Sequence, residues 1–268
     1  MVSYQKLSSL PLRAWRKFAR IPGIDTVVTI SDESLKSLFF WVDAKGRTET
    51  RQTYQNCQSV EDYYTFSRQV FGPHQIKSEI IRFLEFARLE KPEVVCEIGT
   101  ADGGTNFLLS QSLPTVEHMI GVDLYVKKKS KLHYFSRPNQ QMHFINGSSY
   151  DETTVKEVEV ALDGRTIDLL FIDGDHTYKG VKQDFLSYRR FVREGGLIIF
   201  HDIVPDYLTR FGTHSGRWVG DVPRFWKEIK SYYPANEFVE HPDQDGLGIG
   251  VIRYSHSVLL PEDFKALW

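Results

Sequence analysis

From residue 76 to residue 202, segments with apolar residues at helical spacing alternate with short, continuous apolar runs. Apolar residues that return every three or four positions predict helices, at 76–90, 106–113, 152–162 and 178–192. Short apolar runs rich in β-branched residues predict buried strands, at 93–98, 118–123, 141–146, 167–173 and 195–202. Strands separated by helices indicate βαβ units with right-handed crossovers. The pattern therefore predicts an α/β fold around a mostly parallel sheet.

The pattern changes on both sides of this region. Residues 203–221 predict a long loop, a helix follows near 221–233, and two further strands are expected near 236–241 and 247–254. A loop of that length in a compact domain is typical of a lid or a binding element.

Residues 1–75 are rich in aromatic residues and show no strand alternation. They predict a helical extension or lid in front of a domain over 76–268. The first twenty residues carry basic and no acidic side chains, which fits either a solvated amphipathic helix or a membrane-surface segment, with the base rate favouring the former.

Composition narrows the class of protein. The chain has 268 residues, of which 41% are hydrophobic and 25% charged, which excludes disorder as its main state. Its net charge is -2, so it lacks the overall positive charge of a typical nucleic-acid-binding protein. No apolar stretch is long enough to span a membrane, and the N-terminus does not read as a secretory signal. Cys57 and Cys96 do not form a disulfide framework, which indicates a reducing compartment, the cytoplasm. Association into a homo-oligomer stays open.

Polar residues gather where the predicted strands end, at the edge where open α/β sheets bind ligands. Glycines at 99, 103 and 104 allow a ligand to approach the backbone closely, and Asp123 ends the next strand twenty residues after Gly103. A carboxylate in that position can accept both hydroxyls of a ribose. This βαβ unit therefore predicts a nucleoside site.

The glycine-rich loop does not fit a dinucleotide. It reads E-x-G-x-x-x-G-G from Glu97 to Gly104, which departs from the G-x-G-x-x-G spacing, and Glu97 would repel a diphosphate. A carboxylate at this position suits a cationic cofactor that carries an ammonium and a sulfonium group.

A second set of polar residues follows the fourth and fifth predicted strands: Asp173, Asp175, His176, His201 and Asp202. Because these strands are expected to be neighbours, their side chains can converge on a hard cation such as Mg²⁺. A neutral imidazole nearby can take a proton from a hydroxyl group. A purely structural role, in hydrogen bonds and a helix cap, remains the alternative for both histidines and for Asp175.

Five stretches carry a family resemblance over about residues 73–255: EIGTADGGT, IGVDL, FINGSSYD, FIDGDHTYKGVKQDF and GGLIIFHDI. As a set they resemble the class I S-adenosylmethionine-dependent methyltransferases. More narrowly, they are similar to the cephalosporin-hydroxylase-like proteins and the metal-dependent sugar O-methyltransferases. The resemblance implies a Rossmann-like sheet of seven strands with helices on both faces, whose last strand is antiparallel.

The resemblance also implies roles for single residues. Those implied to bind S-adenosylmethionine are Glu97, Gly99, Thr100, Gly103, Asp123, Ser148, Ser149 and Asp173. Those implied to bind Mg²⁺ are Asp173, His201 and Asp202, with His201 standing where relatives have an acid. A histidine is a poorer Mg²⁺ ligand and would favour Mn²⁺, Fe²⁺ or Zn²⁺. His176 is the implied general base, with Asp173 and Asp175 as further catalytic candidates.

The predicted function is therefore transfer of a methyl group to a hydroxyl of a sugar or a small secondary metabolite. Two alternatives stay open. One is a cephalosporin-hydroxylase-like oxidoreductase, and the other is a binding protein that has kept the fold without the chemistry.

Overall fold

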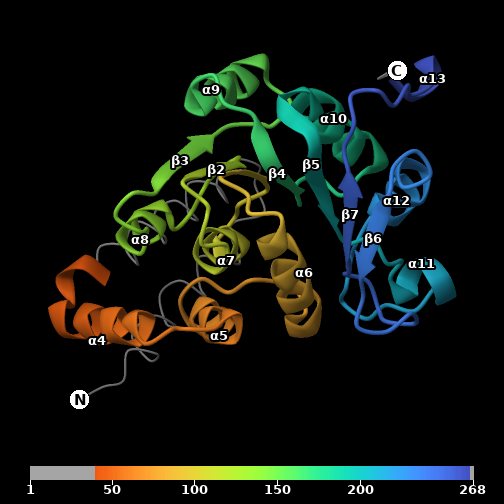
Figure 1. Ribbon diagram of the computed structural model, residues 1–268. Coiled ribbons are helices and arrows are strands. Elements are labelled where there is room, and N and C mark those ends of the chain that lie inside the picture. The colour runs from red at the N-terminus through yellow and green to blue at the C-terminus, as the bar shows by residue number, and fades with distance from the viewer. Residues whose placement is uncertain (1–39, 266–268) are drawn as a thin grey trace, which may run out of the picture. The chain divides into compact units, whose positions relative to one another are not determined.

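The protein is described from a computed structural model, which covers residues 40–265 (Figure 1). The basic segment predicted over the first twenty residues lies outside this range. A first compact unit ends at Gln52, and a second runs from Thr53 to the C-terminus. In the described part of the first unit, the Arg47 guanidinium lies over the Trp41 ring, 5.6 Å from its centroid.

A seven-stranded sheet forms the centre of the second unit. Its strands are β1 (Val94–Ile98), β2 (His118–Asp123), β3 (Gln141–Asn146), β4 (Ile167–Ile172), β5 (Val192–His201), β6 (Ala235–Phe238) and β7 (Ile249–Arg253). They lie in the order β3-β2-β1-β4-β5-β7-β6. Strands β1 to β5 pair in parallel, and β7 runs antiparallel to both of its neighbours. The sheet predicted from the sequence, with an antiparallel last strand, is confirmed.

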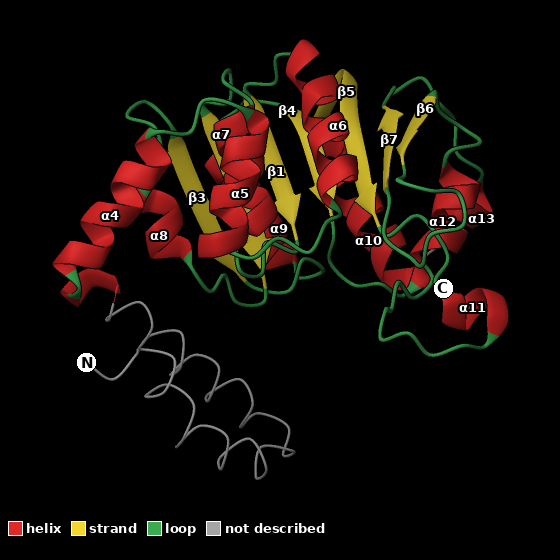
Figure 2. Ribbon diagram, turned by 90° about the horizontal axis from the view of Figure 1, so that it is seen from below, coloured by secondary structure: helices red, strands yellow, loops and turns green. Residues whose placement is uncertain are grey.

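Helices cover both faces of the sheet (Figure 2). Helix α4 (Ala44–Gln55) begins in the first unit. The helices of the second unit are α5 (Val60–Val70), α6 (Lys77–Leu89), α7 (Gly104–Ser112), α8 (Lys129–Tyr134), α9 (Glu152–Leu162), α10 (Tyr178–Tyr188), α11 (Tyr207–Phe211), α12 (Val222–Ile229) and α13 (Glu262–Lys265). A 3₁₀ turn, η1 (Arg189–Phe191), joins α10 to β5. None of the helices within residues 40–265 combines the length and the apolar character that crossing a bilayer requires.

Two apolar clusters hold these layers together. One contains α5, α6 and α7 side chains such as Val60, Phe83 and Leu108 packed on one face of the sheet. The other contains α9, α10 and α12 side chains such as Phe185 and Phe225 packed on the opposite face. Strands β1, β2, β4 and β7 are buried on both faces, which explains why they form continuous apolar runs in the sequence.

Two details differ from the sequence prediction. The segment expected to be a loop over 203–221 contains the short helix α11, which Asp206 caps by accepting a hydrogen bond from the Thr209 N–H at 2.8 Å. The helix predicted over 178–192 ends at Tyr188. Strand β5, predicted to begin at residue 195, begins at Val192. The early start reflects a register shift, in which Ile167 of β4 pairs with Val192. Helix α5, which the sequence assigned to the extension, packs against α7 within the second unit.

Candidate functional site

The carboxyl ends of β1, β4 and β5 lie side by side, because β4 pairs in parallel with both other strands (Figure 2). The loops that follow these three strands begin with Gly99, Asp173 and Asp202. Segments far apart in the sequence therefore meet at one edge of the sheet, as the strand-end pattern predicted.

The glycine-rich loop after β1 depends on its glycines for steric reasons. Gly99 has a φ of +90°, and a Cβ atom there would lie 1.9 Å from the carbonyl oxygen of Asp173. Gly103 has a φ of +83° and stands at the N-cap of α7, where a Cβ would meet the Leu132 side chain at 2.6 Å. Other residues would be strained in this backbone and would collide with the neighbouring loop. The loop can therefore pass tightly between β1 and the start of α7.

Asp123 at the end of β2 is held by two backbone hydrogen bonds. Its Oδ2 accepts from the Ala101 N–H and its Oδ1 from the Tyr125 N–H, both at 2.8 Å. The carboxylate thus braces the glycine-rich loop and still lines a cavity. Each oxygen keeps lone-pair capacity for a further donor, such as a sugar hydroxyl.

That cavity has a volume of about 420 Å³. Its lining includes Gly99, Asp123, Ser148, Ser149, Tyr150 and Asp175. Leu124, whose side chain is 77% exposed, also lines it and offers an apolar surface beside the carboxylate. A pocket lined by carboxylates, hydroxyl groups and an apolar side chain suits a nucleoside.

Glu97 does not line either of the two cavities found at this edge. It is 1% exposed and accepts a hydrogen bond from Asn106 Nδ2 at 3.0 Å. Burial raises the pKa of Glu97 to about 8, and the charges of Asp173 and Asp123 act in the same direction. The sequence predicted that Glu97 binds the cofactor; in the structure its carboxylate is buried and contacts Asn106 in the first turn of α7.

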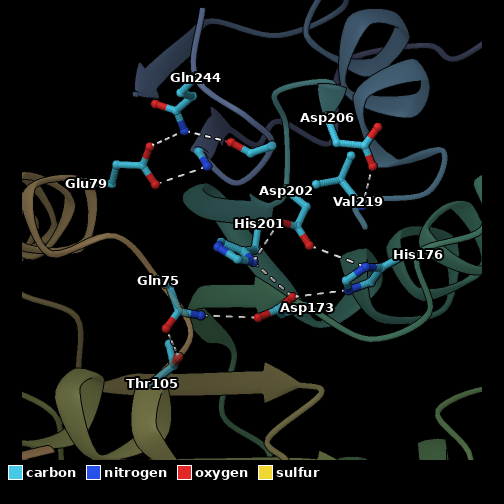
Figure 3. A network of polar contacts seen from close by, with 12 residues as sticks. Gln75, Glu79, Thr105, Asp173, His176, His201, Asp202, Asp206, Val219 and Gln244 are labelled. Atoms are coloured by element: carbon cyan, nitrogen blue, oxygen red, sulfur yellow. Dashed lines mark hydrogen bonds and ion pairs between the residues drawn. The ribbon is translucent and has the colours of Figure 1, made fainter. Parts of the chain in front are cut away.

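A second cavity of about 320 Å³ adjoins the first and shares Gly99, Ala101 and Asp173 with it. Its polar wall holds the cluster formed by Asp173, His176, His201 and Asp202 (Figure 3). Thr100 lines this second cavity, whereas the nucleoside cavity does not include it. Apart from Glu97 and Gly103, which line neither cavity, the sequence-predicted site residues divide between the two adjoining cavities, with Asp173 on their common wall.

Four side chains of the cluster face one another at short range. His201 Nδ1 lies 3.2 Å from Asp173 Oδ1 and 3.5 Å from Asp202 Oδ1. His176 lies between the same two carboxylates, with Nδ1 at 3.3 Å from Asp202 Oδ2 and Nε2 at 3.6 Å from Asp173 Oδ1. Two acids and two imidazoles thus alternate around a small space (Figure 3).

The proximity of these groups shifts their pKa values. Burial acts to lower the pKa of His201, but Asp173 and Asp202 outweigh it and raise the pKa to about 9. The same carboxylates raise the pKa of His176 against the effect of its burial. Burial acts to raise the pKa of Asp173, yet the two histidines hold it below its usual range. Both imidazoles therefore bind a proton more readily than a free histidine does.

The donor set also fits a metal ion. One ligand atom each from Asp173, His201 and Asp202 can be chosen so that all three lie within 4.8 Å of one another. His201 Nε2 and Asp202 Oδ1 are buried without a hydrogen-bond partner among the described residues. Asp202 also adopts a φ of +62°, a costly backbone conformation for a residue with a side chain. Buried unsatisfied donors and strain in one place are typical of a site shaped for a ligand.

Asp175 does not join this cluster. Its Oδ2 accepts from the Tyr150 hydroxyl at 2.9 Å and its Oδ1 from the Thr177 N–H at 2.9 Å. It lines the nucleoside cavity, and Thr177 caps α10 by accepting from the Gly180 N–H. The contacts of Asp175 fit a structural turn before α10, and its side chain does not line the second cavity.

The segment from 212 to 220 bounds the second cavity on the outer side. Asp206 Oδ2 accepts from the Val219 N–H at 3.3 Å, and the Asp221 N–H donates to the His176 carbonyl at 2.7 Å. The Trp218 ring stacks on the His176 imidazole at 5.2 Å between centroids while 63% of Trp218 stays exposed. This segment therefore fixes His176 from one side and presents an open aromatic surface to the cavity.

Sequence reasoning missed two buried polar residues that support the cluster. Gln75 donates through Nε2 to Asp173 Oδ2 at 3.2 Å. Glu79 on α6 is fully buried near His201, where it accepts from Gln244 Nε2 at 2.6 Å and from the Gly248 N–H at 3.0 Å (Figure 3). A signal for Glu79 was present, because a carboxylate lies at helical spacing on the apolar side of 76–90. Gln75 precedes that helix outside every motif.

Comparison with known proteins agrees with this geometry. Residues 96–203 match the sequence profile of a methyltransferase domain family. An uncharacterized protein of Acanthamoeba polyphaga mimivirus is 35% identical over 112 residues, 40% of this chain, and the chain spans about half of that relative, 49% of its length.

Solved structures show the same fold. An O-methyltransferase of Bacillus cereus, in complex with S-adenosylhomocysteine (SAH), superposes with a TM-score of 0.53 at 15% identity, over 73% of this chain and 90% of that one. The MycE methyltransferase of the mycinamycin pathway, in complex with Mg, SAH and mycinamycin VI, superposes with a TM-score of 0.52 at 16% identity, over 77% of this chain and 56% of that one. The chain therefore has the fold of these solved methyltransferases, and residues 96–203 within it match the methyltransferase domain profile.

Proposed function

We propose that the protein transfers the methyl group of S-adenosylmethionine to a hydroxyl group of a small molecule, a sugar or a secondary metabolite. The larger cavity takes the adenosyl part of the donor, and the smaller cavity takes the acceptor. The wall common to both, at Gly99, Ala101 and Asp173, is where the methyl group passes from one to the other.

The cofactor side of this proposal rests on Asp123 and its surroundings. With its two oxygens held by backbone N–H groups, the carboxylate is oriented toward the cavity before any ligand arrives. Preorientation lowers the ordering cost of binding a ribose. Ser148 and Ser149 line the far part of the cavity, where we assign the adenine.

The acceptor side rests on His176. Its ring lies between Asp173 and Asp202, so a proton taken from the acceptor hydroxyl stays on an imidazolium flanked by two carboxylates. Removal of that proton makes the oxygen a better nucleophile for an in-line displacement at the methyl carbon. The exposed face of Trp218 offers a stacking surface for the acceptor ring.

Asp173, His201 and Asp202 would hold a divalent cation, with Mg²⁺ as the first candidate. A bound cation would lower the pKa of a hydroxyl group and fix its orientation. The imidazole in the donor set favours Mn²⁺ or Fe²⁺ more than an all-carboxylate site would, so both metals belong in the test.

The observation that carries the proposal is the position of the acid and histidine cluster directly beside a nucleoside-shaped cavity. Two experiments test it. Calorimetry measures the binding of SAH, and a second assay follows the transfer of a radioactive methyl group from S-adenosylmethionine to a panel of sugar and phenolic hydroxyls. Binding of SAH with transfer to at least one acceptor is expected. Binding of NADH in place of SAH would contradict the cofactor assignment.

These experiments, together with a measurement of O₂ consumption, separate the alternatives. Cofactor binding without any methyl transfer would favour a binding protein, and Fe²⁺-dependent consumption of O₂ would favour a hydroxylase-like oxidoreductase. A small-molecule acceptor, cytoplasmic localisation and association with copies of the same chain stay predictions from the sequence.

A further inference from the structure

We infer that Gln75 is a positioning residue that orients Asp173 for the reaction; the inference rests on the proposed function. Gln75 is 4% exposed and lines the acceptor cavity. Its Nε2 donates to Asp173 Oδ2 at 3.2 Å. The other oxygen, Oδ1, is the one that faces His201 at 3.2 Å and His176 at 3.6 Å. Gln75 therefore engages one carboxylate oxygen and directs the other toward both histidines.

The orientation of the Gln75 amide is itself determined by a neighbour. The Thr105 hydroxyl donates to Gln75 Oε1 at 2.8 Å, in a pair that is buried. With its oxygen engaged in this way, the amide presents its nitrogen to Asp173. The reversed amide would bring its oxygen against the Asp173 carboxylate, two acceptors with no proton between them, although the Thr105 hydroxyl could then accept from the nitrogen. The chain Thr105–Gln75–Asp173 thus has one favourable arrangement.

The backbone that carries Gln75 is also fixed. The Tyr64 hydroxyl donates to the Gln75 carbonyl at 3.4 Å. Just before it, Pro73 packs so closely on α7 that a Cβ at Gly104 would lie 2.5 Å from the Pro73 nitrogen. The ammonium of Lys128 donates to the Phe71 carbonyl at 2.9 Å. Both the side chain and the backbone of Gln75 are therefore held in place by neighbouring residues.

These contacts connect two parts of the site. Thr105 belongs to the first turn of α7, directly after the glycine-rich loop, and Asp173 lies on the wall shared by the two cavities. An error of about 1 Å in the position of a reacting group can cost about 100-fold in rate. Gln75 is placed to prevent such an error at Asp173 without contact with the methyl donor.

Nitrogen NMR of the histidine side chains tests this role without an acceptor. In Gln75→Leu and Thr105→Val we expect the ring nitrogen resonances of His201 and His176 to move, because Asp173 is no longer oriented. Thr105→Ser, which keeps the hydroxyl, should restore the wild-type positions. Gln69→Leu, at an exposed position on α5, is the matched control and should leave them in place. Unchanged histidine resonances in folded Gln75→Leu and Thr105→Val proteins would overturn the inference.

Turnover gives a second readout. Once an acceptor has been found with the wild-type protein, kcat should fall at least tenfold in Gln75→Leu and Thr105→Val while the Kd for SAH stays within threefold. Recovery of most of the lost kcat in Thr105→Ser would support positioning, and loss of SAH affinity in parallel with kcat would contradict it. A wild-type protein that transfers no methyl group would defeat the proposed function, and the NMR comparison would still decide on Gln75.

Discussion

At the scale of single residues, the site is built from acidic and imidazole side chains whose nitrogen and oxygen atoms lie 3.2–3.6 Å apart. His176 and His201 each face Asp173 and Asp202, and each carboxylate in turn faces both imidazoles. Such alternation lets the cluster hold a proton or a cation without leaving a bare charge in a buried place. It also makes every member depend on the orientation of its neighbours, which is why Gln75 matters.

Asp123 gives the most direct residue-scale prediction. Asp123→Asn removes the negative charge and replaces one acceptor oxygen with an NH₂ group, so a backbone hydrogen bond from Ala101 or Tyr125 is lost as well. We expect the Kd for SAH to rise by about 10- to 100-fold, because hydrogen bonds to a charged group contribute about 1.5–3 kcal/mol. Calorimetry measures the change, with exposed Asp163→Asn as the control. Equal affinity in wild type and Asp123→Asn would remove the ribose assignment.

Glu97 predicts a pH dependence of stability. Burial raises its pKa from 4.5 to about 8, so between these values the folded state keeps a proton that the unfolded state releases. Its contribution to the free energy of unfolding is therefore fully present below pH 4.5 and decreases as the pH rises toward 8. Gln at this position binds no proton and keeps an acceptor for Asn106.

Glu97→Gln should consequently become more stable relative to wild type as the pH rises. We expect the difference to change by on the order of 3 kcal/mol between about pH 5 and pH 8.5. Urea unfolding at several pH values measures it, and exposed Glu159→Gln serves as the control. A constant difference across this range would show that Glu97 is ionised in the folded protein.

At the scale of elements, the sequence predicted most of the sheet and less of what surrounds the site. Strands β2 and β3 and helix α9 have the predicted bounds. A short apolar run marks a buried strand such as β2, and apolar residues every three or four positions mark a helix such as α9 that is buried on one side. Helix α11 was missed, because it has only five residues and none of them is buried. The polar residues at strand ends were found, since the parallel topology brings them to one edge.

Supporting residues could not be predicted in the same way. Gln75 reaches Asp173 across 98 positions of sequence, and Glu79 reaches Gly248 across 169. No local period encodes such contacts. Conversely, Asp175 shares a motif with Asp173 but turns away from the cluster, since its carboxylate engages the Tyr150 hydroxyl and the turn at Thr177. The spacing of a motif places residues at an edge, and the neighbouring loops decide which of them face the cavity.

The segment that precedes α12 gives an element-scale prediction. Gly220 has a φ of +57°, and a Cβ there would lie 2.2 Å from the carbonyl oxygen of His176. Gly220→Ala must therefore push this segment or His176 out of place, and methyl transfer should fall at least tenfold with little change in SAH affinity.

Gly212→Ala is the matched control for this substitution. Gly212 also has a positive φ, +69°, but a Cβ there would meet nothing within 4 Å. Both variants should lose about 1–2 kcal/mol of stability from backbone strain, measured by urea unfolding. Equal turnover in the two variants would contradict the role assigned to the contact between Gly220 and His176.

At the scale of the whole site, two cavities with different chemistry share one wall. The larger one is lined by Asp123 and the residues after β3, the smaller one by the acid and histidine cluster, and Asp173 lines both. Donor and acceptor can therefore be bound separately and still meet across a single side chain. This arrangement predicts how three carboxylates differ in their effects on two ligands.

The measurement is the shift in unfolding temperature of each variant when SAH or Mn²⁺ is added. A ligand at 100 times its Kd stabilises the folded state by about 2.7 kcal/mol, so weakened binding appears as a smaller shift. Asp123→Asn should reduce only the SAH shift and Asp202→Asn only the Mn²⁺ shift, because each residue lines one cavity. Asp173→Asn should reduce both. If Asp173→Asn left the SAH shift intact, the two cavities would act independently, and the common wall could not be the place of methyl transfer.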